Sequence, residues 1–137
     1  MDIQNDKKDY RHLPYLVCSC QYHVIFCPKY RRKVLKDGVD TRLKELVISK
    51  QEELEMKVLS IEVMPDHVHL LLDINPKKGI YNVVTNIKGF TSHTLREEFP
   101  FLKTKLPTLW SRGKFISTVG SVSLDTVKQY IEDQKNK

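Results

Sequence analysis

Two histidines one residue apart are the side chains whose type and spacing best suit chemistry. His67 and His69 follow the turn dipeptide Pro65-Asp66, which separates two runs rich in valine, isoleucine and leucine. Successive side chains of a strand point to opposite faces, so both imidazoles should share one face, roughly 7 Å apart at Cα. Neutral imidazole is a common metal ligand, so the pair indicates a divalent cation. A chance pair of polar-face histidines is the alternative, since the chain holds five histidines in 137 residues.

A tyrosine near the C-terminus is the second candidate. Tyr130 and Gln134 are four residues apart and would share one face of a helix. A phenol with a pKa near 10 is a poor nucleophile at pH 7, but a nearby divalent cation would ease the loss of its proton. Gln134 offers a neutral amide oxygen as a further metal ligand. The alternative is that Tyr130 packs with Val127 and Ile131, and spacing alone leaves both open.

A cluster of four cations around one aromatic residue forms a candidate nucleic-acid contact. Its members are Lys29, Tyr30, Arg31, Arg32 and Lys33. Such a run suits phosphate contacts combined with stacking on a base. A solvated loop is the other interpretation of the same residues.

The composition is that of a small basic protein with one domain over residues 1–137. Residues 1–13 of this domain are expected to form a flexible lead-in. Lysine and arginine outnumber aspartate and glutamate by 23 to 17, which gives a net charge of +6 and suits a polyanionic partner. The N-terminus is polar, and no apolar run approaches the roughly 18 residues of a membrane span, so we expect a cytoplasmic protein without membrane contact. Three cysteines, an odd number, argue against a disulfide framework.

The periodicity of apolar residues predicts the elements that position these candidates. The predicted elements are a central strand over 15–27, a helix from 39 to about 56, a hairpin over 58–74, a helix from 80 to about 99, a strand over 115–119 and a final helix capped by Ser123. This β-α-β-β-α-β order with an added helix predicts an α+β, ferredoxin-like fold, with helices on one face of an antiparallel sheet. The other face is expected to be free and to carry the histidines.

Five separated segments of the chain resemble a known family. They are Tyr22-His23 with Cys27–Lys33, Met64–His69, Lys103–Trp110, Phe115–Gly120 and Val127–Gln134. Together they resemble the small single-tyrosine HUH transposases of bacterial and archaeal insertion sequences, the TnpA type. The resemblance covers about residues 15–137.

The resemblance implies a specific chemistry. His67 and His69 would bind Mg²⁺ or Mn²⁺, and Gln134 would complete the site when the last helix is docked. Tyr130 would attack the scissile phosphate of single-stranded DNA and leave a 5′-phosphotyrosine link and a free 3′-OH. The expected protein is a homodimer that recognises hairpins at the ends of a mobile element, with active sites shared between subunits. The basic cluster would hold DNA, and second candidates for this role are Lys103, Lys105, Arg112 and Lys114.

Two alternatives remain beside the transposase. A related nickase or a domesticated relative would share the chemistry and differ in its DNA context. A non-catalytic RNA-binding module is also possible on the order of elements, because RRM domains have the same order. The strands lack the aromatic signature of such modules, which argues against this alternative.

Overall fold

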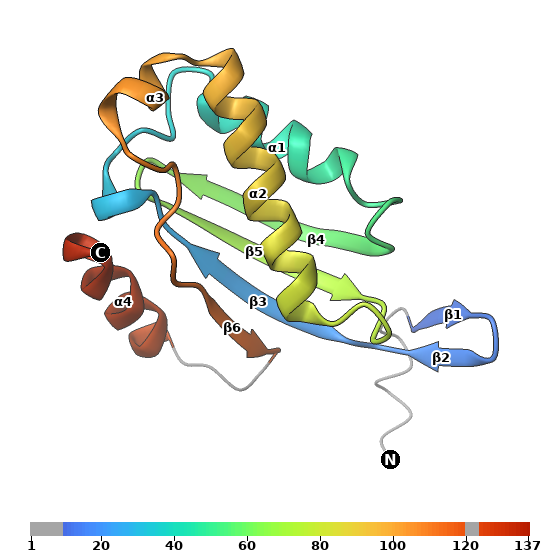
Figure 1. The fold of residues 1–137 in the computed structure, drawn as a ribbon. Coiled ribbons are helices and arrows are strands. Elements are labelled where there is room, and N and C mark those ends of the chain that lie inside the picture. The colour runs from blue at the N-terminus through green and yellow to red at the C-terminus, as the bar shows by residue number, and fades with distance from the viewer. Residues whose placement is uncertain (1–9, 120–123) are drawn as a thin grey trace.

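The computed structural model describes residues 10–119 and 124–137 as an antiparallel sheet with helices packed on it (Figure 1). The sheet has the strand order β4-β5-β3-β6. Its strands are β3 (Gln21–Phe26), β4 (Met56–Met64), β5 (His67–Ile74) and β6 (Phe115–Thr118). The α+β class, the antiparallel sheet and the predicted order of elements are therefore confirmed.

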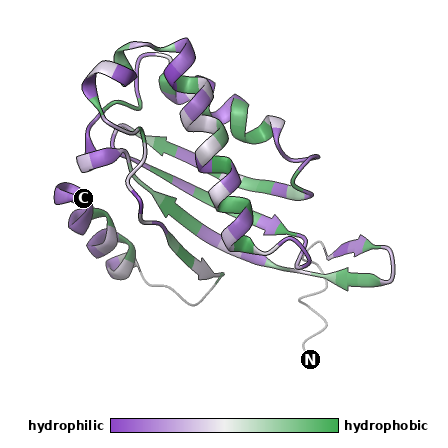
Figure 2. Cartoon of the chain, viewed as in Figure 1, coloured by the Kyte–Doolittle hydropathy of each residue, from purple (hydrophilic) through white to green (hydrophobic). Residues whose placement is uncertain are grey.

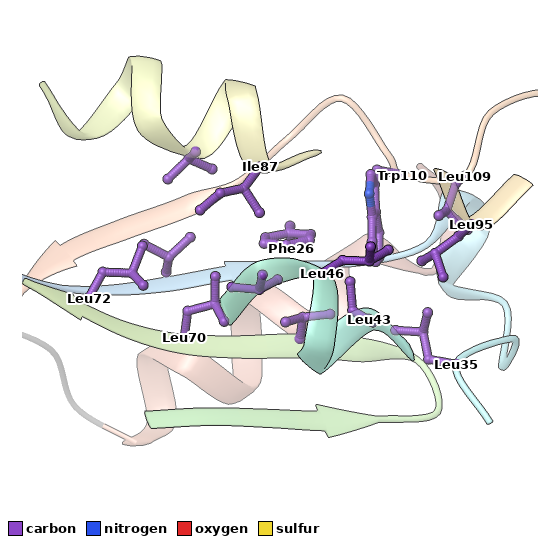
Figure 3. Packing of buried hydrophobic residues seen from close by; sticks show 14 of the residues in the cluster. Phe26, Leu35, Leu43, Leu46, Leu70, Leu72, Ile87, Leu95, Leu109 and Trp110 are labelled. Carbon is purple, nitrogen blue, oxygen red and sulfur yellow. The ribbon is translucent and has the colours of Figure 1, made fainter. Parts of the chain in front are cut away.

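Two helices, α1 (Val39–Ser49) and α2 (Ile80–Glu98), cover one face of this sheet (Figure 1). Between helices and sheet lies the hydrophobic core, in which Phe26, Leu70 and Leu72 are fully buried (Figure 3). Figure 2 shows hydrophobic residues along much of β3 and β5. The alternation of side chains in β5 thus buries one face, and it places the histidines on the opposite face as predicted.

The hairpin that carries the histidines has the predicted turn. β4 and β5 pair on either side of residues 65–66, with Met64 opposite His67 and Glu62 opposite His69. A backbone hydrogen bond from Leu35 N to Pro65 O (3.0 Å) fixes the turn to the segment that follows the basic cluster. The segment that follows the basic cluster therefore helps to set the position of the hairpin turn and of the histidine pair beside it.

The first strand differs from the prediction. Leu16–Cys18 (β2) leaves the main sheet and pairs with Arg11–Leu13 (β1) in a separate hairpin. The lead-in predicted over residues 1–13 is therefore wrong for Arg11–Leu13, and residues 1–9 lie outside the described part. The hairpin is anchored because Arg11 donates hydrogen bonds to the carbonyls of Asp73 (3.1 Å) and Glu55 (2.8 Å).

The helical segments also differ in detail. α1 ends at Ser49, short of the predicted residue 56, and Glu55 adopts a left-handed backbone (φ 52°) just before β4 begins. The loop predicted before β6 contains a short helix, α3 (Phe101–Lys105), and the basic cluster includes a 3₁₀ turn, η2 (Lys29–Arg31). The last helix, α4 (Leu124–Asp133), continues into η3 (Gln134–Asn136). Its predicted cap, Ser123, lies outside the described residues.

The second face of the sheet is not free as expected, because α4 covers part of it. Figure 1 shows α4 beside β3 and β6, away from α1 and α2. Ile25 and Cys27 point to this face and are nevertheless fully buried. The rings of Phe115 in β6 and Tyr130 in α4 lie 5.5 Å apart. The C-terminal helix is thus packed on the face that carries the histidines.

None of the helices in the described ranges has both the length and the hydropathy that a bilayer span requires.

Candidate active site

The first histidine of the pair is held by the carboxylate beside it. His67 Nδ1 lies 2.9 Å from Asp66 Oδ1. Because an ionised carboxylate can only accept, Nδ1 is the donor to Asp66, and in a neutral imidazole this leaves Nε2 as the nitrogen that can bind a metal. A histidine whose other ring nitrogen donates to a carboxylate is typical of metal ligands. The chemistry of His67 therefore fits the predicted metal site.

The second histidine contacts a third imidazole, which the sequence did not single out. His69 Nε2 lies 3.1 Å from His23 Nδ1 on β3. Burial, and then the neighbouring His23, lower the pKa of His69, which favours the neutral form that ligates metals. The alternation of β3 puts His23 on its polar side, but only the pairing of β3 with β5 brings it to His69.

A cation at this pair needs ligands beyond the histidines. Among residues 10–119 and 124–137, no three side chains of histidine, cysteine, aspartate or glutamate are grouped to hold a metal. The predicted third ligand, Gln134, is buried, and its Oε1 lies 3.4 Å from Ser111 Oγ. As an amide oxygen it suits Mg²⁺ or Mn²⁺. Two imidazoles and one amide oxygen form a mixed ligand set, so the choice of Mg²⁺ or Mn²⁺ stays a prediction.

The candidate nucleophile, Tyr130, is half-buried and faces Gly113. A Cβ atom at Gly113 would lie 3.4 Å from Tyr130 Oη and 3.8 Å from Gln134 Oε1. Tyr130 and Gln134 thus share one side of the C-terminal segment, as their spacing predicts. Tyr130 Oη is buried without a hydrogen-bond partner in the described part of the chain. Tyr130 thus packs against Phe115 and lies beside Gly113, whereas the packing with Val127 and Ile131 that the sequence left open stays a prediction.

A row of paired residues joins the two candidates across the sheet. Ile25 on β3 pairs with His69 on one side and with Phe115 on the other. Directly paired residues share a face, so Phe115 and His69 lie on the same side, two strand spacings or about 10 Å apart. Because Tyr130 packs on Phe115, the tyrosine and the histidine pair occupy one face of the sheet. A tyrosine nucleophile and a metal held by the histidines would both have to lie on this face.

A buried lysine supports the segment under the tyrosine. Lys88 Nζ donates hydrogen bonds to the carbonyls of Ser111 (2.8 Å) and Gly113 (3.0 Å). Burial, and then the charge of Lys114, lower the pKa of Lys88 to about 8. In the sequence, Lys88 lies on the polar side of the helix, where a lysine is usually solvated. By binding these two carbonyls, Lys88 holds in place the segment that lies next to Tyr130 and Gln134.

The residues predicted to contact DNA fall into two groups, exposed cations and cations that are paired within the protein. Arg32 and Lys33 are exposed, and together with Lys105 they line one hollow. This brings part of the basic cluster and part of the second basic set to the same surface. Lys29 Nζ lies 5.1 Å from the centre of the Tyr30 ring, and Lys114 Nζ lies 4.3 Å from that of Tyr81. The DNA contact predicted for the exposed cations stays a prediction.

Two residues of these sets have partners within the protein. Arg31 is largely enclosed and forms ion pairs with Asp66 and Glu132. This engagement argues against the DNA contact predicted for Arg31. Lys103 lies 3.3 Å from Glu97, but this pair is exposed and leaves Lys103 accessible. Arg112 is exposed on the segment that Lys88 holds.

The buried phenol predicts how the stability of the native protein depends on pH. Burial, and then the nearby Cys27, raise the pKa of Tyr130 above its usual value near 10. A group whose pKa is raised by folding stabilises the native state below its unfolded pKa and loses this effect as the pH rises through the folded pKa. We therefore expect urea unfolding to show that the native protein loses stability relative to Tyr130→Phe as the pH rises above about 10. Identical pH profiles of the two proteins would contradict this burial.

Comparison with known proteins identifies the class of this protein as a transposase. The chain belongs to the IS200-like transposase family, because the sequence model described as "Transposase IS200 like" matches residues 16–134. It is 37% identical to the ISDra2 transposase TnpA of Deinococcus radiodurans, over 88% of this chain and 88% of that protein. It is 31% identical to the transposase for insertion sequence element IS200 of Salmonella typhimurium, over 93% of this chain and 87% of the other.

Solved structures agree with this assignment. A crystal structure of a Deinococcus radiodurans R1 protein assigned as a transposase matches with a TM-score of 0.84 and 32% identity, over 93% of this chain and 99% of the other. A REP-associated tyrosine transposase bound to a REP hairpin matches with a TM-score of 0.57, over 89% of this chain and 68% of the other. At 12% identity, this second likeness concerns the fold alone. Membership of the family implies an enzyme that cleaves and transfers DNA.

Proposed function

We propose that this transposase cleaves and rejoins single-stranded DNA at the ends of an insertion sequence through a 5′-phosphotyrosine intermediate. The supporting observation is that Tyr130 and the His67/His69 pair occupy one face of the sheet, joined by the row Phe115–Ile25–His69. The sequence alone could place these groups on separate elements but could not bring them to one surface.

Tyr130 supplies the nucleophile in this proposal. Its oxygen attacks the scissile phosphorus, the phenolic proton leaves, and the bond from phosphorus to the 3′-oxygen breaks. One DNA end stays bound to Tyr130 through its 5′-phosphate, and the other leaves as a 3′-OH. The phosphotyrosine keeps the energy of the broken ester bond, so a 3′-OH can later displace Tyr130 and rejoin strands without ATP.

The histidine pair provides the proposed metal site. His67, His69 and Gln134 would hold Mg²⁺ or Mn²⁺, and Asp66 would orient His67. When bound, such an ion neutralises charge on the phosphate and on the leaving 3′-oxygen. In the docked position, α4 keeps the hydroxyl of Tyr130 neutral and enclosed. Binding of DNA must therefore expose the hydroxyl of Tyr130 before it can attack.

The proposed partners are a DNA hairpin and a second copy of the chain. The hollow lined by Arg32, Lys33 and Lys105 concentrates positive charge where a phosphate backbone could lie. A solved transposase of the same fold binds a REP hairpin, which supports the same kind of ligand here. In a homodimer, the surface that receives α4 could accept the helix of either subunit, so that the active sites would be shared.

The decisive experiment uses single-stranded DNA from the flanks of the gene. The protein is incubated with this DNA and Mn²⁺, separated on a denaturing gel and mapped by mass spectrometry. We expect a denaturation-resistant adduct attached to Tyr130, and a cut strand that ends in a 3′-OH. Double-stranded DNA of the same sequence is the matched control and should give little adduct. Attachment to another residue, or no adduct from folded protein, would contradict the proposed function.

A further inference from the structure

We infer that Arg31 is a positioning residue that fastens the tyrosine helix to the histidine turn, an inference that rests on the proposed function of both elements. One guanidinium makes three contacts that reach two separate parts of the site. Its Nε lies 3.2 Å from Asp66 Oδ2 in the turn. Its Nη1 lies 2.9 Å from Glu132 Oε2 and donates to the carbonyl of Ile131 (3.3 Å) on α4.

The contact with the turn reaches the metal site through one carboxylate. Asp66 uses Oδ2 for Arg31 and Oδ1 for His67 Nδ1. The side chains of Arg31 and Asp66 are each only 18% exposed, so water screens this pair less than an open surface pair. The position of Arg31 therefore bears on the orientation of His67, because Asp66 contacts both.

The contact with the helix lies next to the nucleophile. Ile131 and Glu132 directly follow Tyr130, so Arg31 binds the helical turn that carries the phenol. A backbone bond from Tyr30 N to Lys137 O (3.0 Å) ties the C-terminal end to the same segment. Two contacts from η2 thus hold the final segment on both sides of Gln134.

The backbone around Arg31 supports a specific role. Tyr30 and Arg31 both adopt left-handed conformations (φ 57° and 50°), which bulky side chains seldom take. Such conformations persist only where the surroundings fix them, and they concentrate at functional sites. A residue needed only as a cation for DNA would not require this backbone. Here the turn aims the guanidinium into the protein.

The neighbouring arginine offers a matched control. Arg32 is exposed and lines the basic hollow, whereas Arg31 is enclosed. Arg31→Gln and Arg32→Gln each remove one positive charge from the same segment. A role in DNA binding predicts similar effects for the two variants, whereas the inferred role predicts different ones.

The test measures amide hydrogen exchange of residues 124–137 and Mn²⁺ affinity in the full-length protein without DNA. Arg31→Gln is expected to accelerate exchange in α4 about tenfold and to weaken Mn²⁺ binding by about 10-fold or more, the usual effect of losing support behind a metal ligand. Arg32→Gln should change neither, but it should weaken binding of hairpin DNA and reduce its salt slope by about one ion. Glu132→Gln should accelerate exchange with a smaller effect on Mn²⁺.

Arg31→Lys keeps the charge and tests whether the branched guanidinium matters. We expect it to restore only part of the protection of α4, because one ammonium cannot reproduce all three contacts. Normal exchange and Mn²⁺ affinity in Arg31→Gln, or equal effects of the two glutamine variants, would overturn the inference. If Arg31→Gln does not fold, Arg31→Lys and Glu132→Gln decide by the same criteria. Failure of the proposed function would appear differently, as a wild-type protein that binds no Mn²⁺ or forms no DNA adduct.

Discussion

The Tyr130→Phe variant is expected to form no covalent adduct with single-stranded DNA while it still binds hairpin DNA. The substitution removes the oxygen that attacks phosphorus and leaves the ring that packs on Phe115. Removal of the nucleophile from another covalent enzyme lowers the rate on the order of 10⁶-fold, and we expect a loss of comparable size. Gel quantification of the adduct, with a binding assay alongside, measures both effects.

The structure predicts that this variant folds normally. Tyr130 Oη is buried without a hydrogen-bond partner among the described residues, so its removal breaks no such bond. Tyr81→Phe on the exposed side of α2 is the control and should keep full activity. An adduct that persists at wild-type level in Tyr130→Phe would exclude Tyr130 as the nucleophile.

The His67→Ala variant should lose DNA cleavage, and removal of metal with EDTA should have the same effect on the native protein. Without its imidazole, the site loses one of its two proposed histidine ligands and the contact with Asp66. We expect at least about a 100-fold loss of Mn²⁺ affinity, which exceeds the usual effect of changing a residue behind the ligand. Titration of Mn²⁺ by electron paramagnetic resonance measures this loss directly.

A histidine far from the pair controls for the loss of an imidazole. His93 lies exposed on α2, on the helical layer opposite the site, and His93→Ala should bind Mn²⁺ and cleave DNA normally. Asp66→Asn should lose about 10- to 100-fold in Mn²⁺ affinity, because the amide supports His67 more weakly. Cleavage that continues in EDTA would contradict metal assistance.

The sequence was sufficient to predict the main elements of the sheet and its long helices, and the faces of the central strands. The alternation around Val68 and Leu70 correctly separated the buried side of β5 from the side with the histidines. Spacing also placed Tyr130 and Gln134 on a common side of the last helix. These successes share one cause, since local periodicity depends on near neighbours in the chain.

The contacts between distant segments could not be predicted in this way. Arg31 reaches Asp66 and Glu132, which lie far from it along the chain, and its sequence neighbours make it look like one more solvated cation. Lys88 is similar, because its acceptors belong to a loop that follows the helix. His23 meets His69 only through the register of β3 and β5. Charged residues with internal partners have the same local pattern as charged residues in water.

The enclosed hydroxyl of Tyr130 has a consequence for the cell that carries this gene. In the proposed reaction, a hydroxyl that is buried beside Phe115 and Gly113 would not attack every DNA strand that reaches the protein. In that reaction, the host chromosome would be spared from random nicking until a ligand rearranges the final helix and exposes this oxygen.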